Sequence, residues 1–233
     1  MLIKCLCSGS TGNCYLVNLG SNTILLDAGI KTLEELVKEI NINDIDLAFI
    51  SHQHIDHNRL QEKLVLRGVC VVDGNLIQDF TEIALNSRFS GLNSMYAFNV
   101  IHGKEEKDRV NCAGMIFQTE NECLLYITDF NLCEWDLSDF EFTHVMVECN
   151  YIKALALASN DYMRASENIY RHRELEGTIN FLKTLNLSKC EEIILMHLST
   201  SFSNPIIMGA KVYKEFGIKT GVCRKNGGID YYG

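Results

Sequence analysis

Three histidines and one aspartate stand within six consecutive positions in the segment Ser51-His-Gln-His-Ile-Asp-His57. His52 and His54 alternate, so both side chains can point to one side of an extended turn. Asp56 and His57 follow at the next bend and can reach a second centre nearby. Because imidazole nitrogens and carboxylate oxygens bind divalent metal ions, the spacing favours a site for two metals over a polar loop of solvated histidines.

Three further candidate ligands each follow an apolar run of the sequence. They are His102, Asp129 and His197, which come after residues 98–101, 125–128 and 193–196. Functional side chains usually gather at strand ends, and the two oxygens of a carboxylate such as Asp129 can bridge two cations. We therefore predict that these three residues complete the two-metal site.

Hydrophobic patterning predicts the elements that position these ligands. Apolar or alternating runs predict strands at residues 2–7, 14–19, 23–26, 47–50, 68–72, 95–101, 113–118, 123–128, 142–147, 191–196 and 229–231. Helical spacing predicts helices at 33–40, at 75–85, within 161–186, and at 205–216, where the only proline begins the helix. Strand-rich halves that are each followed by helices predict an α/β fold with two stacked sheets and helices outside. This is an αββα four-layer sandwich, formed as a single domain over residues 1–233.

Composition and charge limit the kinds of partner. The 233 residues are 47% hydrophobic, and 30 acidic against 21 basic residues give a formal net charge of -9. An anionic partner must therefore be held by a local site, and a long duplex along a basic groove is disfavoured. The sequence shows no secretion signal and no apolar stretch of the roughly 20 residues that cross a bilayer. We expect no membrane partner, a cytoplasmic location and ten reduced cysteines.

The sequence resembles the metallo-β-lactamase superfamily, whose five motifs occur here in order. They correspond to Asp27 in Leu25-Leu-Asp-Ala-Gly29, the Ser51–His57 segment, His102, Asp129 and His197. The resemblance implies an αββα metallo-β-lactamase sandwich and two divalent metal ions. One metal takes His52, His54 and His102, the other takes Asp56, His57 and His197, and Asp129 bridges them.

The same resemblance implies that Asp27 orients a ligand histidine, although an acidic residue in a turn before Gly29 is the structural alternative. Zinc suits imidazole and carboxylate ligands best, and manganese or iron stay open. Asp129 stands where antibiotic-hydrolysing members typically carry cysteine, which argues against β-lactam hydrolysis.

Two later segments resemble tRNase Z. Thr143-His-Val-Met-Val-Glu-Cys-Asn150 is similar to its His-Glu-Ala-Thr motif, with Val147 in place of the histidine, and residues 166–178 resemble a later segment that carries a histidine. By this resemblance Glu148 and His172 form an acid pair: the carboxylate orients the imidazole, and the imidazole protonates the leaving oxygen. Asp56 is the third predicted catalytic residue. The alternatives are a solvated carboxylate for Glu148 and a surface histidine for His172.

The N-terminal segment Leu6-Cys-Ser-Gly-Ser-Thr-Gly-Asn-Cys-Tyr15 resembles WalJ-type exonucleases and the related phage anti-Pycsar phosphodiesterases. Its polar residues could hold a phosphate or line the metal site, and an ordinary hairpin turn explains them equally well. These residues are Ser8, Ser10, Thr11 and Asn13. Arg171 and Arg173 could likewise clamp phosphate or lie at a solvated helix start.

The predicted function is that of a binuclear metal-dependent phosphodiesterase acting on nucleotides, with 3′,5′-cyclic mononucleotides as the favoured substrates and linear monophosphates as products. The alternative is a WalJ-like exonuclease acting on DNA ends, especially if a homodimer pools basic residues. A catalytically silent nucleotide-binding protein is the third prediction. The resemblance implies the cytoplasm of a bacterium, or a phage-encoded anti-defence role in the host cytoplasm.

Overall fold

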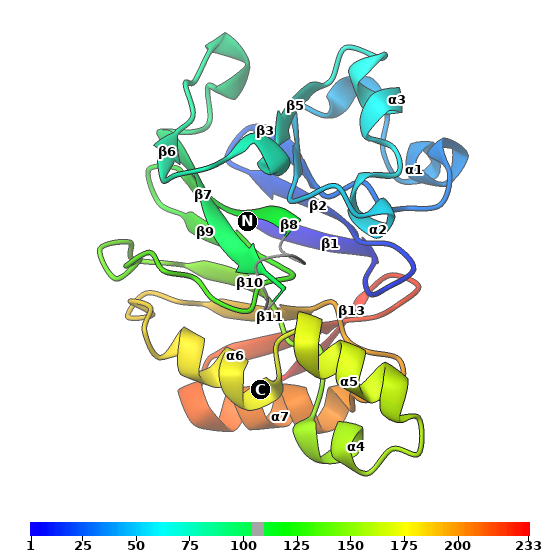
Figure 1. Ribbon diagram of the computed structural model, residues 1–233. Helices are drawn as coiled ribbons and strands as arrows, with labels where there is room; N and C mark the ends of the chain where they lie inside the picture. Colours follow the sequence, from blue (N-terminus) through cyan, green and yellow to red (C-terminus); the bar gives the residue numbers. More distant parts are fainter. Residues whose placement is uncertain (104–109) are drawn as a thin grey trace.

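A computed structural model of the chain describes residues 1–103 and 110–233 (Figure 1). The first sheet has five strands in the order β1-β2-β3-β4-β5. Its strands are β1 (Leu2–Cys7), β2 (Cys14–Leu19), β3 (Asn22–Leu26), β4 (Leu47–Ile50) and β5 (Cys70–Asp73). β3, β4 and β5 run parallel, so their carboxyl ends lie at one edge of the sheet.

The second sheet has eight strands among the described residues, in the order β13-β12-β11-β10-β9-β8-β7-β6. They are β6 (Thr81–Glu82), β7 (Ser94–His102), β8 (Val110–Gln118), β9 (Cys123–Ile127), β10 (His144–Glu148), β11 (Glu192–Met196), β12 (Lys219–Cys223) and β13 (Ile229–Tyr232). The central strands β9 to β12 are parallel. Their carboxyl ends therefore also share one edge.

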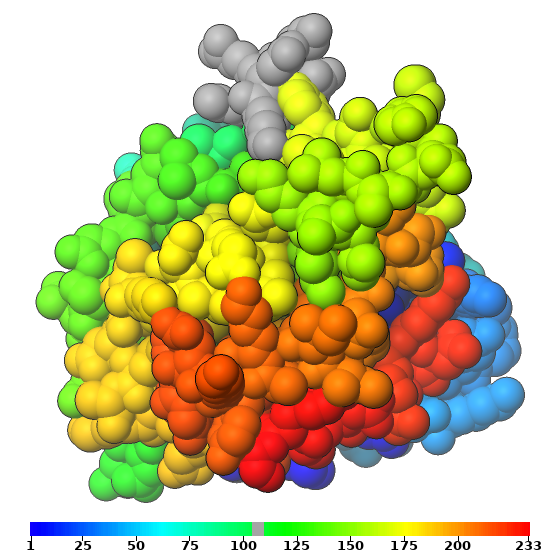
Figure 2. Space-filling model, turned by 90° about the horizontal axis from the view of Figure 1, so that it is seen from below, coloured from blue at the N-terminus to red at the C-terminus, as the bar shows by residue number. Residues whose placement is uncertain are grey.

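Helices cover the outer face of each sheet. Next to the first sheet lie α1 (Leu33–Glu39), α2 (Ile55–Asn58) and α3 (Gln61–Val65), with the 3-10 turns Ile42–Asp44, Gly74–Leu76 and Ser87–Phe89 in the same part of the chain. Next to the second lie α4 (Lys153–Leu157), α5 (Tyr162–Arg171), α6 (Leu175–Leu182) and α7 (Pro205–Phe216). Figure 2 shows this second helical layer from below, with α7 in orange, α6 in yellow and α5 in yellow-green. No helix of the described residues is long and apolar enough to span a membrane.

Three hydrophobic cores separate the four layers. Alternation along β10 shows the principle: Val145 and Val147 pack toward the helices, whereas Met146 packs between the sheets. Tyr15 and Tyr126 also lie between the sheets, and a further core lies beneath α1 and α3. The predicted αββα sandwich is therefore confirmed.

The secondary-structure prediction was wrong for residues 75–85, and it did not include α2, α3, α4, β6 or β12. Residues 75–85 form no helix, because the chain makes a short 3-10 turn and then pairs β6 with β7. Ile77, Ile83 and Leu85 pack in this extended form on the core between the sheets, so tertiary contacts override the helical spacing. Strand β12 was missed, since Lys219-Thr-Gly-Val-Cys223 is short and contains a glycine, yet it pairs with β11 on one side and β13 on the other.

Candidate metal centre

The predicted ligands converge at the edge where the parallel strands of both sheets end. The Ser51–His57 segment follows β4, His102 ends β7, Asp129 lies just beyond β9, and His197 follows β11. Their donor atoms fall into groups within which all lie within 4.8 Å of one another. Strands far apart in sequence therefore bring together every predicted ligand.

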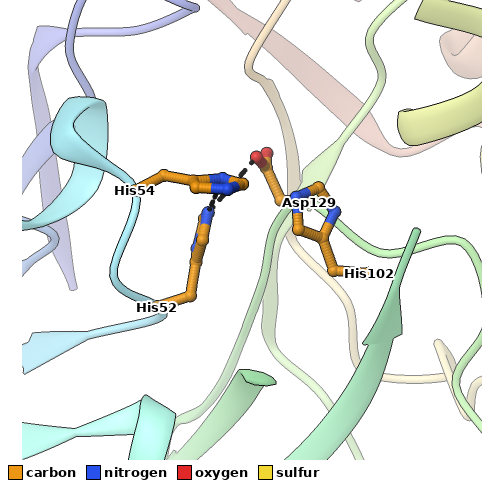
Figure 3. A group of neighbouring side chains, drawn as sticks. All are labelled: His52, His54, His102 and Asp129. Atoms are coloured by element: carbon orange, nitrogen blue, oxygen red, sulfur yellow. Dashed lines mark hydrogen bonds and ion pairs between the residues drawn. The ribbon is translucent and has the colours of Figure 1, made fainter. Parts of the chain in front are cut away.

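The first group consists of His52, His54, His102 and Asp129 (Figure 3). His52 Nε2 and His54 Nδ1 lie 2.8 Å apart, and His52 Nε2 is 3.7 Å from Asp129 Oδ2. His102 Nδ1 is buried without a hydrogen-bond partner among the described residues. Burial lowers the pKa of His52 and lowers the pKa of His102 to about 4. Both imidazoles are therefore neutral near pH 7 and keep a lone pair for a metal ion.

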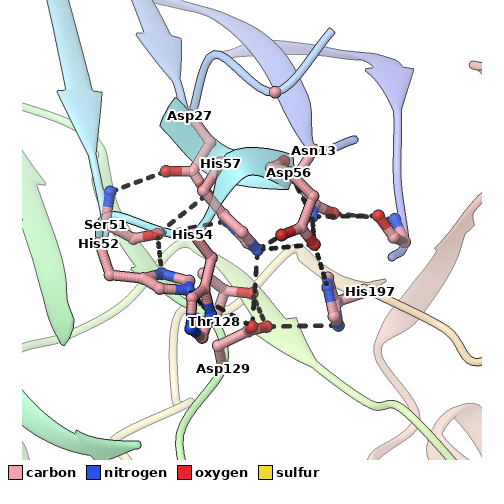
Figure 4. A network of polar contacts seen from close by, with 12 residues as sticks. Asn13, Asp27, Ser51, His52, His54, Asp56, His57, Thr128, Asp129 and His197 are labelled. Atoms are coloured by element: carbon pink, nitrogen blue, oxygen red, sulfur yellow. Dashed lines mark hydrogen bonds and ion pairs between the residues drawn. The ribbon is translucent and has the colours of Figure 1, made fainter. Parts of the chain in front are cut away.

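The second group consists of Asp56, His57 and His197. Asp56 Oδ2 lies 3.5 Å from His57 Nε2 and 3.4 Å from His197 Nε2. Asp129 stands between the groups: Oδ2 is 3.5 Å from His57 Nε2, and Oδ1 is 3.3 Å from His197 Nδ1 (Figure 4). This geometry suits a bridging carboxylate, and the assignment of ligands to each metal stays a prediction.

The charges around this second group favour a cation. Burial by itself lowers the pKa of His57, but the carboxylates of Asp27 and Asp129 outweigh it and raise the pKa to about 10. For His197 the effect of burial is outweighed by Asp129, Asp56 and Glu148, so its pKa is also raised. The described residues thus fit divalent metals in both groups. The first group offers three imidazoles and one carboxylate, and the second offers two imidazoles and one carboxylate.

Asp27 lies beneath the Ser51–His57 segment and forms hydrogen bonds with it. Its carboxylate accepts hydrogen bonds from His57 Nδ1 at 2.5 Å, from Ser51 N at 2.7 Å, from Ser51 Oγ at 3.0 Å and from the Tyr126 hydroxyl at 2.6 Å. All four residues are buried. The contact with His57 agrees with the predicted orienting role of Asp27. Tyr126 comes from β9 of the opposite sheet, and no sequence motif signals it.

Backbone strain is concentrated at this site. Among the described residues, the non-glycine residues with positive φ are Asp27 (55°), Asp129 (47°) and His197 (55°). Such a conformation costs roughly 1–3 kcal/mol at each residue and persists only where its surroundings require it. Here each one turns a carboxylate or imidazole toward the centre just after a strand.

The N-terminal loop supports the metal-binding segment. Ser8 Oγ accepts a hydrogen bond from His197 N at 2.9 Å, and Asn13 N donates to Asp56 O at 2.7 Å, while the Asn13 side chain lies 3.0 Å from His57 Nε2. Ser8 and Asn13 are buried, whereas Ser10 and Thr11 are exposed. Ser10 lines the cavity at the metal centre, and Thr11 lines a separate pocket. A phosphate-binding role of this loop stays a prediction.

Glu148 and His172 form a close pair beside the predicted metal ligands. Glu148, at the end of β10, is buried, and its Oε1 lies 2.8 Å from His172 Nδ1. Burial and Asp129 raise the pKa of Glu148, but the interactions with His172 and His197 outweigh them, so the net shift is downward. Donor atoms of both residues lie within 4.8 Å of those of Asp129 and His197. The predicted acid pair is thus brought to the centre, and its catalytic role stays a prediction.

A cavity of about 380 Å³ opens above these side chains. Arg171 lines it, as does Arg164, which was not predicted. Arg173 lies elsewhere: its guanidinium carbon is 4.3 Å from the Phe130 ring centroid, and it donates to Asn131 O and Gly177 O. The two arginines considered together as a phosphate clamp are therefore separated by the structure.

Comparisons with known sequences each match part of this chain. The family model described as the metallo-beta-lactamase superfamily matches residues 8–73. The protein named exodeoxyribonuclease YycJ of Bacillus anthracis is 45% identical over 56 residues, which are 22% of this chain and 21% of that protein. The match thus spans about a fifth of that relative's length.

Solved structures are similar over nearly the whole chain. The metallo-beta-lactamase fold protein YhfI of Bacillus subtilis has a TM-score of 0.71 at 15% identity, covering 99% of this chain and 98% of that one. Igni18, a metallo hydrolase of Ignicoccus hospitalis, has 0.66 at 16% identity over 99% and 98%. The short form of human tRNase Z has 0.57 at 13% identity over 86% and 93%. At these identities the structures show the fold, and together with the family model they confirm the resemblance to the metallo-β-lactamase superfamily.

Proposed function

We propose that this chain is a binuclear metal-dependent phosphodiesterase that hydrolyses nucleotide phosphodiester bonds. The observation that carries the proposal is the place of Asp129, which belongs to the first donor group and lies 3.5 Å and 3.3 Å from His57 and His197 of the second. His172, which is paired with buried Glu148, lines the cavity above them. Divalent metal ions bound there would supply Lewis-acid activation of water and of the substrate phosphate. Zinc is the proposed metal because its usual ligands are imidazole and carboxylate, and manganese is the alternative.

The protein's own contribution to bond cleavage is a proton donor that neighbouring residues hold in position. His172 Nδ1 faces Glu148 Oε1 at 2.8 Å, so Nε2 is the nitrogen left for the substrate. Glu148 is in turn held by the Phe130 backbone N–H, which donates to Oε2 at 3.1 Å. A carboxylate fixed in this way orients the imidazole. His172 can then give a proton from Nε2 to the oxygen that leaves phosphorus.

Substrates of the proposed activity are 3′,5′-cyclic mononucleotides. A cavity of about 380 Å³ lies in the range typical of small-molecule sites, and the chain's net charge of -9 disfavours long anionic polymers. The second candidate is a DNA end, which the exodeoxyribonuclease name of the curated relative supports. A DNA end needs only a few local phosphate contacts, and a homodimer would add basic residues to them.

Product analysis tests the proposal and separates the two substrates. Purified protein loaded with zinc or with manganese is mixed with 3′,5′-cyclic mononucleotides and with 5′-phosphorylated DNA, and the products are resolved by chromatography. We expect linear monophosphates from the cyclic substrates. Mononucleotides released from DNA alone would support the second candidate. A fully metal-loaded protein that binds nucleotides but cleaves neither substrate would overturn the proposal in favour of a silent nucleotide-binding protein. Light scattering during size-exclusion chromatography tests the homodimer.

A further inference from the structure

One face of α5 lines the cavity at the metal centre. Arg164, Glu167, Asn168 and Arg171 stand at helical positions i, i+3, i+4 and i+7, so they share one side of the helix, and all four line the cavity. Another side of the helix is attached to the protein by apolar contacts, since Ala165 packs in a small cluster with Tyr151 and Phe202. The helix therefore presents a polar, doubly cationic face to whatever the cavity holds.

These arginines place positive charge in the cavity of a chain that is negatively charged overall. The chain carries a net charge of -9, and the cavity is also lined by the carboxylates of Asp56 and Asp129. An anionic substrate must therefore be attracted by local positive groups. A guanidinium presents a planar fork of donors that matches the oxygens of a phosphate, which a solvated lysine does not do.

Arg171 and Arg164 are both free to meet a ligand. Arg171 keeps about half of its side chain exposed (49%), and its contact with Glu167 is a loose ion pair of 3.6 Å. Arg164 makes a long contact of 3.4 Å with Thr200, in the segment that follows His197. Arg173 is different, because its guanidinium is engaged by the Phe130 ring and two backbone carbonyls.

A polar relay fixes α5 relative to a metal ligand. Asn168 Nδ2 donates to Asn150 Oδ1 at 2.5 Å, and Asn150 Nδ2 donates to His197 O at 2.7 Å. At the end of the helix His172, its C-terminal cap, contacts Glu148. The arginines are thus carried by a helix whose position is tied to the catalytic side of the cavity.

We propose that α5 is the substrate-recognition helix, and that Arg164 and Arg171 bind the phosphate-bearing part of the substrate. Glu167 weakens this binding because its carboxylate pairs with Arg171 and repels an anion. The identity of the ligand as a nucleotide rests on the proposed function, whereas recognition of an anion by this helix face rests on the cavity itself.

Calorimetric titration of metal-loaded protein with a nucleoside 5′-monophosphate tests the inference. We expect Arg164→Ala and Arg171→Ala each to weaken binding about tenfold, since a hydrogen bond to a charged group is lost in each case. Arg171→Lys keeps the charge without the planar fork and should lose less. Glu167→Gln should tighten binding, about twofold. Arg67→Ala, which removes an exposed arginine after α3, is the matched control and should leave affinity unchanged.

The outcomes separate this inference from the proposed function. Metal content is measured in every variant and should match that of the wild type. Wild-type affinity in both Arg164→Ala and Arg171→Ala would overturn the recognition role, as would a wild-type protein that does not bind the monophosphate. A wild type that cleaves no phosphodiester, yet binds the monophosphate through these arginines, would overturn the proposed function and leave the role of α5 in place.

Discussion

The two walls of the cavity are built in different ways. The wall from the first sheet carries His52, His54, Asp56 and His57 within one short segment, and buried Asp27 accepts four hydrogen bonds beneath it. The wall from the second sheet is assembled from β10, α5 and the segment after β11, and its arginines are half-exposed or exposed. The first wall holds four of the seven predicted ligands in one hydrogen-bonded segment, whereas α5 of the second wall presents exposed charged side chains beside the other three.

Asp129 joins the two walls, and its removal should have the largest effect. Asp129→Ala takes away the carboxylate that belongs to the first donor group and lies within 3.5 Å of both histidines of the second, so we expect loss of bound metal and a fall in kcat/KM of roughly 10³-fold or more. Elemental analysis and steady-state kinetics measure both. Asp139→Ala, at an exposed aspartate, is the control. An Asp129→Ala protein that keeps its metals and full turnover would show that the walls work without this bridge.

His172 tests whether the second wall supplies chemistry as well as recognition. His172→Ala should slow hydrolysis of substrates with poor leaving groups by about 10²- to 10⁴-fold, because the proton donor is lost. A 4-nitrophenyl phosphodiester, whose leaving group needs no proton, serves as the internal control and should react at nearly the wild-type rate. Equal loss on both substrates, or no loss on either, would contradict the acid role while the metal site stood.

The rigidity of the first wall can be tested at a glycine. A Cβ atom at Gly29 would lie 1.7 Å from Asp56 O, a backbone atom that cannot move without shifting the metal-binding segment. We expect Gly29→Ala to lower the free energy of unfolding by about 3 kcal/mol. Thermal or denaturant unfolding measures it.

Gly177→Ala provides the comparison in α6, a helix beside the second sheet and away from the cavity lining. Its Cβ would meet only side-chain atoms of Arg173 and Glu174, at 3.5 Å or more, and the residue lies inside α6. Because alanine favours a helix interior, this change should be neutral or stabilise the protein by up to about 1 kcal/mol. Similar destabilisation by both substitutions would contradict the particular rigidity of the first wall.

The smallest expected effect concerns the support beneath the first wall. Tyr126→Phe removes one of the four hydrogen bonds to Asp27 and leaves the ring in the core between the sheets. The free energy of unfolding should fall by about 1 kcal/mol, with the metal content unchanged. Tyr162→Phe, at an exposed residue of α5, should change nothing. A Tyr126→Phe protein that loses metal would show that the hydroxyl is part of the coordination geometry rather than of its support.

The sequence predicted much of the fold and all of the candidate metal ligands. Strands at 14–19 and 47–50 and the helix at 205–216 coincide with β2, β4 and α7. Their signals are local: apolar alternation, a compact apolar run, and a proline that begins a helix after the capping residue Asn204. The prediction for residues 75–85 failed because the apolar residues of this segment flank the two-residue edge strand β6 and pack on the core between the sheets, while β6 itself pairs with β7.

What the sequence by itself determined is the candidate set of metal ligands, because four donors lie within six positions and the other three lie at or just after the ends of strands. What only the tertiary structure decided is the support beneath Asp27 and the choice of arginines that line the cavity. Tyr126 meets Asp27 across 99 positions, and Arg164 rather than Arg173 enters the cavity. Such contacts leave no local pattern, since they depend on how two sheets and a helix pack rather than on the spacing of residues along the chain.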